Sequence, residues 1–176
     1  MRQISKCAKN KSETLTHPWE CVFDEHSRVL ILGSFPSPKS RQNGFYYAHS
    51  QNIFWKTLAR TRRQDEPASD IASKKAFLLR NHIALWDVLH SCEISGASDN
   101  TIKNPTPNDF SALFKKAKIK AVFTTGKAAT ALFKTLCAKK SGFEPIYLPS
   151  TSPANRAQQK NEDFLEEWKK INLFLE

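Results

Sequence analysis

The chain has 176 residues, 40% of them hydrophobic, which suffices for the core of one domain and argues against a mainly disordered protein. No apolar stretch approaches the length of a membrane span, and the polar start over residues 1–6 is not a secretory signal. We therefore expect a cytoplasmic protein without a membrane partner. The formal net charge of +10 favours a polyanionic partner such as nucleic acid, although a generally basic surface would give the same composition.

Taken in chain order, the predicted elements alternate between strands and helices. Residues 1–24 show no clear hydrophobic periodicity and are expected to form an irregular arm or a short helix, followed by a single domain over 25–176. Short apolar runs predict strands, and amphipathic segments between them predict helices. The strands are expected at 28–32, 82–86, 120–124 and 146–148, and the helices at 52–60, 73–81, 108–118, 127–138 and 159–175.

Two polar stretches, 64–70 and 91–106, are predicted to be loops, and Asn108 would cap the helix that follows the second of them. Strands that alternate with helices are typical of a parallel sheet covered on both faces. The predicted fold class is therefore α/β, with three layers (α/β/α) around a central four-stranded, mainly parallel sheet.

The cysteines give no sign of a metal centre. Cys7, Cys21, Cys92 and Cys137 include no C-x-x-C pair and no grouping suited to an iron–sulfur cluster. We predict idle thiols, no metal and no cofactor. Gly33 begins no G-x-G-x-x-G pattern, so an enzyme with a nucleotide cofactor has little support.

Aromatic and amide side chains follow the first predicted strand. Residues 33–40 read Gly-Ser-Phe-Pro-Ser-Pro-Lys-Ser, and residues 45–55 read Phe-Tyr-Tyr-Ala-His-Ser-Gln-Asn-Ile-Phe-Trp. Near the other end of the chain, residues 148–155 read Leu-Pro-Ser-Thr-Ser-Pro-Ala-Asn. Ligands usually bind at the carboxyl ends of the strands in open α/β sheets, so the loop after the first strand is a candidate functional site.

These segments, together with Ala-Leu-Trp-Asp-Val at 84–88, resemble the uracil-DNA glycosylase superfamily, and the ordered set is most similar to its hypoxanthine-DNA glycosylase branch. The resemblance implies an enzyme of base-excision repair that flips a deaminated base out of DNA and hydrolyses its N-glycosidic bond. Hypoxanthine would be the first substrate, with uracil or xanthine next. We also expect a monofunctional reaction without a lyase step, because no lysine in the motifs is placed as an imine-forming nucleophile. We expect a monomer that associates with the nucleoid.

The resemblance assigns roles to individual side chains. Asn52, in the Asn-x-Phe-Trp motif, would orient the hydrolytic water with its carboxamide, although its position alone would suggest a helix cap. Tyr47 stands where the mismatch-specific branch of the superfamily carries its base-stacking Phe, with a packed aromatic loop as the alternative. Phe35 replaces a water-positioning Asn of that branch and is expected beside the base.

Thr125 stands where the hypoxanthine branch usually carries an Asn, just before Gly126. An Asn amide could pair with both N1–H and O6 of hypoxanthine, whereas one hydroxyl cannot make both bonds at once. Either Thr125 with backbone groups suffices to bind the base, another side chain compensates, or the substrate differs.

Contacts to the DNA backbone are expected from the loops rich in Ser and Thr. The resemblance also implies that residues 154–156 push a wedge into the space that the flipped base leaves in the DNA. The predicted DNA-binding residues are Ser37, Ser40, Ser150, Thr151, Ser152, Asn155 and Arg156. Without its partner motifs, the loop around residue 151 would be an ordinary turn. His49 is expected to be structural or close to a phosphate. Asp87 is expected to cap a turn or hold the next loop, with a catalytic carboxylate as the alternative.

Two rival functions remain open. One is a nucleic-acid-binding relative in which Phe35 and Thr125 mark a decayed site, and the other is an enzyme that acts on free nucleosides. A DNA affinity that falls steeply with salt would favour a polynucleotide substrate.

Overall fold

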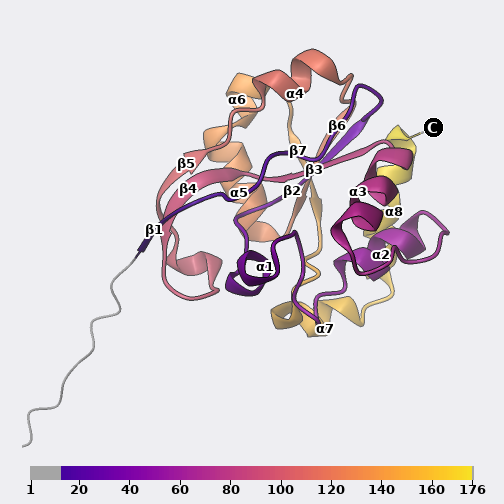
Figure 1. Cartoon of the computed structure of the whole chain (residues 1–176), viewed down its shortest axis with the longest axis horizontal. Coiled ribbons are helices and arrows are strands. Elements are labelled where there is room, and N and C mark those ends of the chain that lie inside the picture. Colours follow the sequence, from indigo (N-terminus) through magenta and orange to yellow (C-terminus); the bar gives the residue numbers. More distant parts are fainter. Residues whose placement is uncertain (1–12, 176) are drawn as a thin grey trace, which may run out of the picture.

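The computed structural model describes residues 13–175 and contains two β-sheets flanked by helices (Figure 1). The larger sheet is parallel throughout, with the strand order β3-β2-β6-β7. Its strands are β2 (Val29–Gly33), β3 (Ile83–Asp87), β6 (Ala121–Thr125) and β7 (Pro145–Leu148). The predicted α/β class and the four predicted strands are therefore confirmed.

Burial on both faces explains the composition of β2. This strand pairs with β3 on one side and β6 on the other, and all five of its residues are buried. A strand covered on both faces has no polar side, so its sequence is a continuous apolar run that does not alternate with polar residues.

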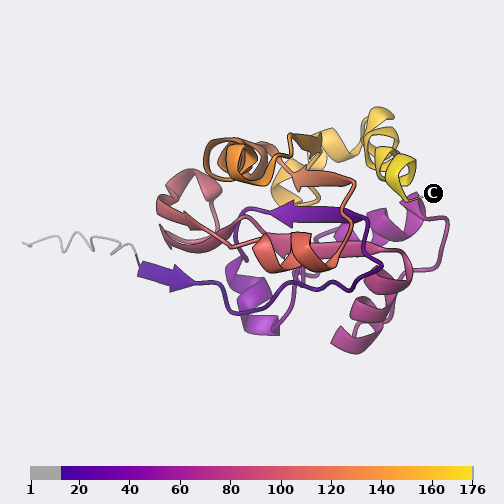
Figure 2. The same ribbon diagram turned by 90° about the horizontal axis from the view of Figure 1, so that it is seen from above.

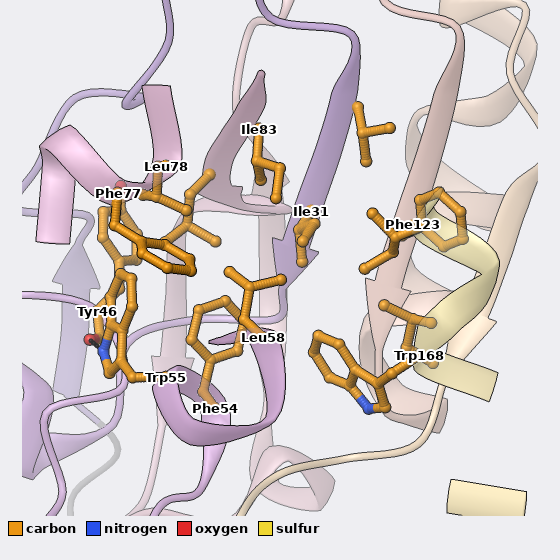
Figure 3. Close-up of a cluster of buried hydrophobic side chains, with 14 of the residues drawn as sticks. Ile31, Tyr46, Phe54, Trp55, Leu58, Phe77, Leu78, Ile83, Phe123 and Trp168 are labelled. Carbon is orange, nitrogen blue, oxygen red and sulfur yellow. Dashed lines mark hydrogen bonds between the residues drawn. The ribbon is translucent and has the colours of Figure 1, made fainter. Parts of the chain in front are cut away.

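Helices α2 (Phe54–Thr61), α3 (Ile71–Arg80) and α8 (Asp163–Lys169) cover one face of the parallel sheet. Figure 3 shows the core on this face, where Ile31 and Phe123 from the sheet meet Phe54 and Leu58 of α2 and Trp168 of α8. These side chains are fully buried.

The opposite face packs against α4 (Ser111–Lys116), α5 (Lys127–Leu136) and α6 (Ala138–Ser141). The alternate side chains of β2, Leu30 and Leu32, belong to this second core. The smaller sheet adds Leu89, Cys92 and Ile94 to it. Both views place the smaller sheet at the opposite side of the molecule from α2, α3 and α8 (Figures 1 and 2).

The smaller sheet corrects two predictions. It is antiparallel, with the order β1-β4-β5, and consists of β1 (Glu13–Thr16), β4 (Leu89–Ile94) and β5 (Lys103–Pro107). The predicted loop over 91–106 is therefore mostly a hairpin, closed by the short helix η1 (Asp99–Thr101). The two prolines of β5 argued against a strand in the sequence, because proline is found in strands mainly at sheet edges. The structure places β5 at such an edge.

The predicted irregular arm is wrong over residues 13–16, which form β1, whereas residues 17–24 are irregular apart from one bridge at Val22. Besides β1, which pairs with β4, the arm contributes Val22, whose backbone exchanges two hydrogen bonds with Leu85 at 3.0 and 2.9 Å. These pairings attach the segment to both sheets. The remainder of the predicted arm, residues 1–12, lies outside the described part of the chain.

The predicted helices agree with the structure in place but not always in extent. Helices α2, α3 and α5 occupy the predicted segments, and the loop over 64–70 is confirmed. The segment 159–175 is divided among the end of α7 (Arg156–Gln159), α8 and η3 (Lys170–Phe174). Helix α1 (Pro38–Asn43) and the single turn η2 (Pro153–Asn155) were not predicted.

Asn108 does not cap α4. Its Nδ2 donates to the backbone oxygen of Asp87 at 2.9 Å, and the helix begins only at Ser111. Asn108 therefore joins the segment between β5 and α4 to the end of β3. No helix within residues 13–175 is long and apolar enough to cross a membrane.

Candidate active site

A cavity of about 580 Å³ lies at the carboxyl ends of the parallel strands. Its wall combines the residues that follow β2, β3, β6 and β7 with the connection from α1 to α2 and the tip of the β4–β5 hairpin. The predicted site residues in this wall are Phe35, Ser37, Ser40, Tyr47, Asn52, Thr125, Ser150, Thr151, Ser152 and Asn155. Arg156 is exposed and lies outside it.

Two glycines allow the segments of the wall to approach one another. A Cβ at Gly33 would lie 2.4 Å from Oδ1 of Asp87 and 3.0 Å from the Tyr47 hydroxyl oxygen, so no larger residue fits there. Gly126 has a φ of 87°, a left-handed conformation that favours glycine, and a Cβ there would lie 3.3 Å from Cβ of Ser150.

Tyr47 is held rigidly in the wall. Its ring stacks on Phe54, with 3.8 Å between ring centroids and 6° between the planes, and its hydroxyl lies 3.0 Å from Oγ1 of Thr125. The backbone of Tyr47 has a φ of 53°, which is uncommon for an aromatic residue. Burial, reinforced by the charge of Asp87, raises the pKa of Tyr47. The ring of Tyr47 is therefore fixed in the cavity wall, and its hydroxyl stays protonated at neutral pH.

Thr125 is restricted by its own hydrogen bonds. Its hydroxyl donates to the backbone oxygen of Leu32 at 3.3 Å and can accept from the hydroxyl of Tyr47. A hydroxyl has one donor hydrogen and two accepting lone pairs. Thr125 can therefore offer one acceptor to a bound base while these two bonds persist.

Asn52 lies in the turn before α2, one residue ahead of the N-cap Ile53, and lines the cavity. Its Oδ1 accepts from the backbone N–H of Phe54 at 3.0 Å, and its own N–H donates to the backbone oxygen of His49 at 2.8 Å. Its side chain is half-buried in the cavity wall. The position of Asn52 suggested a helix cap, but the N-cap of α2 is Ile53. The carboxamide oxygen of Asn52 keeps a second lone pair that can accept from a water. His49 is not part of the wall.

Phe35 is buried at the edge of the cavity, with the guanidinium of Arg41 5.9 Å from its ring centroid.

Ser37 and Ser40 form hydrogen bonds with the local backbone: Ser37 Oγ caps α1 by accepting from the N–H of Ser40 at 3.2 Å. Ser40 Oγ in turn accepts from the N–H of Ala48 at 3.3 Å.

The loop after β7 is fixed by hydrogen bonds at almost every polar group. Oγ of Ser150 accepts from the N–H of Ser152 at 3.2 Å, and Nδ2 of Asn155 donates to the backbone oxygen of Ser150 at 2.9 Å. Trp168 Nε1 donates to the backbone oxygen of Pro149 at 3.1 Å and anchors the loop to the core. The loop therefore presents a preformed surface to the cavity.

Thr151 differs from its neighbours in this loop. It is only 1% exposed, and its Oγ1 makes no hydrogen bond within residues 13–175. Its backbone oxygen accepts from the N–H of Ile53 at 3.2 Å, so Thr151 lies against the segment that carries Asn52.

Two carboxylates lie in the wall: Asp87, for which the sequence left a catalytic role as the alternative, and Asp99, to which the sequence assigned no role. Asp87 pairs through Oδ2 with Nε2 of His17 at 2.8 Å, and Asp99 accepts from Oγ of Ser34 at 2.6 Å. Burial raises the pKa of Asp99, the Ser34 hydrogen bond opposes the rise, and the charge of Asp87 adds to it. Neither pair has a sequence signal, because His17 lies in an aperiodic segment and Asp99 in a predicted loop.

Within residues 13–175, no group of three or more His, Cys, Asp or Glu side chains is arranged to hold a metal ion. Cys21, Cys92 and Cys137 are free thiols, and burial raises the pKa of Cys137 to about 11. Cys7 lies outside the described residues.

Two curated proteins are similar to this chain over most of its length. A protein called hypoxanthine DNA glycosylase from Methanosarcina acetivorans is 34% identical over 153 residues, which cover 85% of this chain and 93% of that protein. A protein of the same name from Methanosarcina barkeri is 36% identical over 141 residues, covering 80% and 88%.

The fold has a solved relative as well. The NMR solution structure of a candidate uracil DNA glycosylase from M. acetivorans matches with a TM-score of 0.74 and 29% identity, covering 90% of this chain and 96% of that one. The family model described as "Uracil DNA glycosylase superfamily" matches residues 21–176. The chain belongs to the uracil DNA glycosylase superfamily.

Proposed function

We propose that this chain is a monofunctional DNA glycosylase that hydrolyses the N-glycosidic bond of hypoxanthine in DNA, with uracil or xanthine as further substrates. The observation that carries the proposal is the cavity at the carboxyl ends of the parallel strands, where Tyr47, Thr125 and Asn52 share one wall. The names of the two Methanosarcina relatives support hypoxanthine as the base.

The cavity suits a flipped base. A volume of about 580 Å³ is within the range of small-molecule sites, and the base would stack on the ring of Tyr47, with Phe35 at its edge. Stacking on an aromatic ring contributes about 1–3 kcal/mol per base and tolerates different bases. This platform would therefore supply affinity, while hydrogen-bonding groups select the base.

The free acceptor of Thr125 can read one feature of the base. Hypoxanthine, xanthine and uracil each carry a ring N–H next to a carbonyl, whereas adenine and cytosine have an unprotonated ring nitrogen at that place. An oxygen that can only accept would favour hypoxanthine over adenine and uracil over cytosine, but it would not separate xanthine from guanine, which also carries a ring N–H next to a carbonyl. The single acceptor of Thr125 would select the base less strictly than an Asn amide, which can make two hydrogen bonds to it. This agrees with more than one deaminated base as substrate.

Asn52 would direct water at the sugar. The bond between C1′ and the base breaks with its electron pair moving to the base, and a water oxygen forms the new bond to C1′. A carboxamide is not a strong base, so Asn52 would orient the water rather than remove its proton. The proton passes to solvent or to the departing base.

The serines of the loops, Asn155 and the exposed Arg156 would hold the DNA backbone, and the net charge of +10 would attract it.

Hydrolysis needs no amine nucleophile, so no lyase step is expected. Lys127 is the lysine in the cavity wall formed by the described residues, so it is the one to test for a lyase step. Borohydride should trap no covalent complex between the protein and DNA.

The test is a base-release assay on duplexes that carry a single hypoxanthine, uracil or xanthine, followed by alkaline cleavage of the abasic strand. Wild type and Asn52→Ala should be compared under single-turnover conditions. Release of a base that is lost in Asn52→Ala supports the proposal. DNA binding without release of any base would overturn it and leave a binding protein on a glycosylase fold.

A further inference from the structure

We propose that Asp99 is a second catalytic residue of the cavity, a general acid that gives its proton to N7 of the departing purine. This inference rests on the proposed glycosylase function. Its basis is the carboxyl group of Asp99 at the tip of the β4–β5 hairpin, which lines the cavity and is held there through one of its two oxygens.

The other oxygen of this carboxyl can meet a ligand. Oδ2 of Asp99 accepts from Oγ of Ser34 at 2.6 Å, and Oδ1 makes no hydrogen bond within residues 13–175. Oδ1 is not enclosed, because in this part of the chain the side-chain polar atom that is both enclosed and unpaired is Oγ1 of Thr151. Asp99 is half-buried in the wall, so Oδ1 is open to the cavity.

Asp99 lies close to the proposed base platform. Its partner Ser34 follows Gly33, and a Cβ on Gly33 would lie 3.0 Å from the hydroxyl oxygen of Tyr47. The charge of Asp99 reaches that hydroxyl: burial is the main cause of the raised pKa of Tyr47, and the charges of Asp87 and Asp99 add to it. A base stacked on Tyr47 would therefore lie beside the carboxyl of Asp99.

The charged groups around Asp99 do not neutralise it. Within residues 13–175 it forms no ion pair, whereas Asp87 is paired with the imidazole of His17 at 2.8 Å. The titratable groups coupled to Asp99 by charge are Asp87 of β3, Tyr47 in the connection from α1 to α2, and Cys92 of β4. Arg41 of α1 acts on Cys92 but donates to the backbone oxygen of Pro36 at 3.1 Å, and Lys127 lies in the wall without an ion pair to Asp99.

These surroundings favour the protonated form of Asp99. Burial raises its pKa, the hydrogen bond from Ser34 opposes the rise, and the charge of Asp87 adds to it. When two carboxyl groups share a site in different surroundings, the one whose proton is favoured serves as the acid. Asp99 is that group in this cavity.

The proton of Asp99 would assist the departure of the base. Purines carry an unprotonated ring nitrogen at N7 that can accept it. As the bond between C1′ and N9 breaks, its electron pair moves into the purine and the proton of Asp99 passes to N7, so the base leaves neutral. The water oxygen directed by Asn52 forms the new bond to C1′, and the proton that this water gives up restores the carboxyl of Asp99, directly or through solvent.

The deciding comparison combines Asp99→Asn with a duplex that carries 7-deazahypoxanthine, in which C–H replaces N7. Asparagine keeps an acceptor for Ser34 but has no acid proton, so the single-turnover rate of hypoxanthine release should fall by about 100-fold, a typical contribution of general acid catalysis. Wild type should lose a similar factor on the 7-deaza duplex, and Asp99→Asn should slow that substrate no further. An equal loss for Asp99→Asn on both duplexes would overturn the inference.

The pH dependence separates a proton donor from a structural role. The wild-type rate on hypoxanthine should fall as the pH rises through the pKa of Asp99, because only the protonated form acts, and Asp99→Asn should lack this decline. Ser34→Ala removes the hydrogen bond that lowers the pKa of Asp99, so the decline should move to higher pH. A decline that persists unchanged in Asp99→Asn would also contradict the inference.

Asp65→Asn is the matched control, because it changes the net charge equally and Asp65 is exposed in the loop over 64–70. Its rate on hypoxanthine should equal that of wild type. A loss as large as that of Asp99→Asn would assign the effect to net charge and exclude the acid. If wild type releases no base, the proposed function itself fails, which is a separate result.

Discussion

Nε2 of His17 donates to Oδ2 of Asp87 across 2.8 Å, and both side chains are almost entirely excluded from solvent. The ring of His17 is surrounded by aromatic side chains, with centroid distances of 5.7 Å to Trp19, 6.0 Å to Phe35 and 5.9 Å to Tyr46. This pair connects the segment after β1 to the last residue of β3, and Asp87 lies in the cavity wall.

Removing His17 should strongly destabilise the protein. His17→Ala leaves the carboxylate of Asp87 buried without its partner, and breaking such a buried pair typically costs about 3–5 kcal/mol. Urea unfolding followed by tryptophan fluorescence would measure the change in the free energy of unfolding. The control is His26→Ala, which breaks the exposed contact of His26 with Glu25 at 3.6 Å and should leave stability close to wild type. Equal effects of the two substitutions would contradict a structural role for the buried pair.

Asp99→Asn should stabilise the protein at neutral pH. Burial raises the pKa of Asp99 above its ordinary 3.8, so the folded state binds the proton more tightly than the unfolded chain. Stability is therefore lost as the pH rises through the folded-state pKa. Asparagine keeps an acceptor for Ser34 but cannot ionise, so thermal melting should show a gain at about pH 7.5 that disappears near pH 3.

Asp109→Asn provides a control of opposite sign. Its pKa is lowered, chiefly by the backbone N–H of Ser111, so the carboxylate of Asp109 stabilises the fold above its ordinary pKa and loses this effect as the pH falls. Asp109→Asn should therefore lower the melting temperature at neutral pH. A gain for Asp99→Asn that persisted unchanged in acid would show that ionisation is not its cause.

Tyr47 should contribute to base release mainly through its ring. Tyr47→Ala removes the platform, and a loss of about 1–3 kcal/mol of stacking corresponds to a fall in kcat/KM for hypoxanthine of roughly 5- to 150-fold. Tyr47→Phe keeps the stack on Phe54 and loses only the hydrogen bond to Thr125, so its fall should be much smaller. Base-release kinetics on both variants would measure this. If phenylalanine were as damaging as alanine, the hydroxyl rather than the ring would be the important group.

Arg156 should contact a phosphate and therefore affect DNA affinity without regard to the base. Arg156→Ala should weaken binding to damaged and undamaged duplexes alike and reduce the slope of log Kd against log salt by about 1. Fluorescence anisotropy over a salt series would measure the slope. The control is Lys139→Ala on α6, which lies at the opposite end of the molecule from α7 in Figure 1 and should leave the slope unchanged. A slope that stays the same in Arg156→Ala would remove this residue from the DNA interface.

The parts of the fold that sequence predicted well are those with strong local signals. β2 is buried within the sheet, and its continuous apolar run predicts a strand directly. Phe54 and Leu58 of α2 are buried against the sheet, and their spacing predicts one apolar face of a helix. The smaller sheet depends on pairing between β1 and β4, about 75 residues apart in the chain, which no local pattern reports.

The site shows the same division. Tyr47, Asn52 and Thr125 were found through their motifs, and the structure brings them into one cavity wall. Their hydrogen bonds could not be predicted: that Oδ1 of Asn52 accepts from the N–H of Phe54, and that the hydroxyl of Thr151 has no partner within residues 13–175, follow only from the packed backbone. His17 was missed because its partner is 70 positions away.

Because His17 pairs with Asp87, the folded domain begins before residue 25, where the sequence motifs alone would place its start. A protein truncated to residues 25–176 would keep every motif of the superfamily but lose β1, the backbone pairing of Val22 with Leu85 and the imidazole that pairs with Asp87. It would expose the edge of β4 that pairs with β1 and leave the carboxylate of Asp87 without its partner in the wall of the cavity. The segment before the first recognisable motif thus supports the wall of the candidate active site, and shortened versions of the protein should retain it from residue 13 onward.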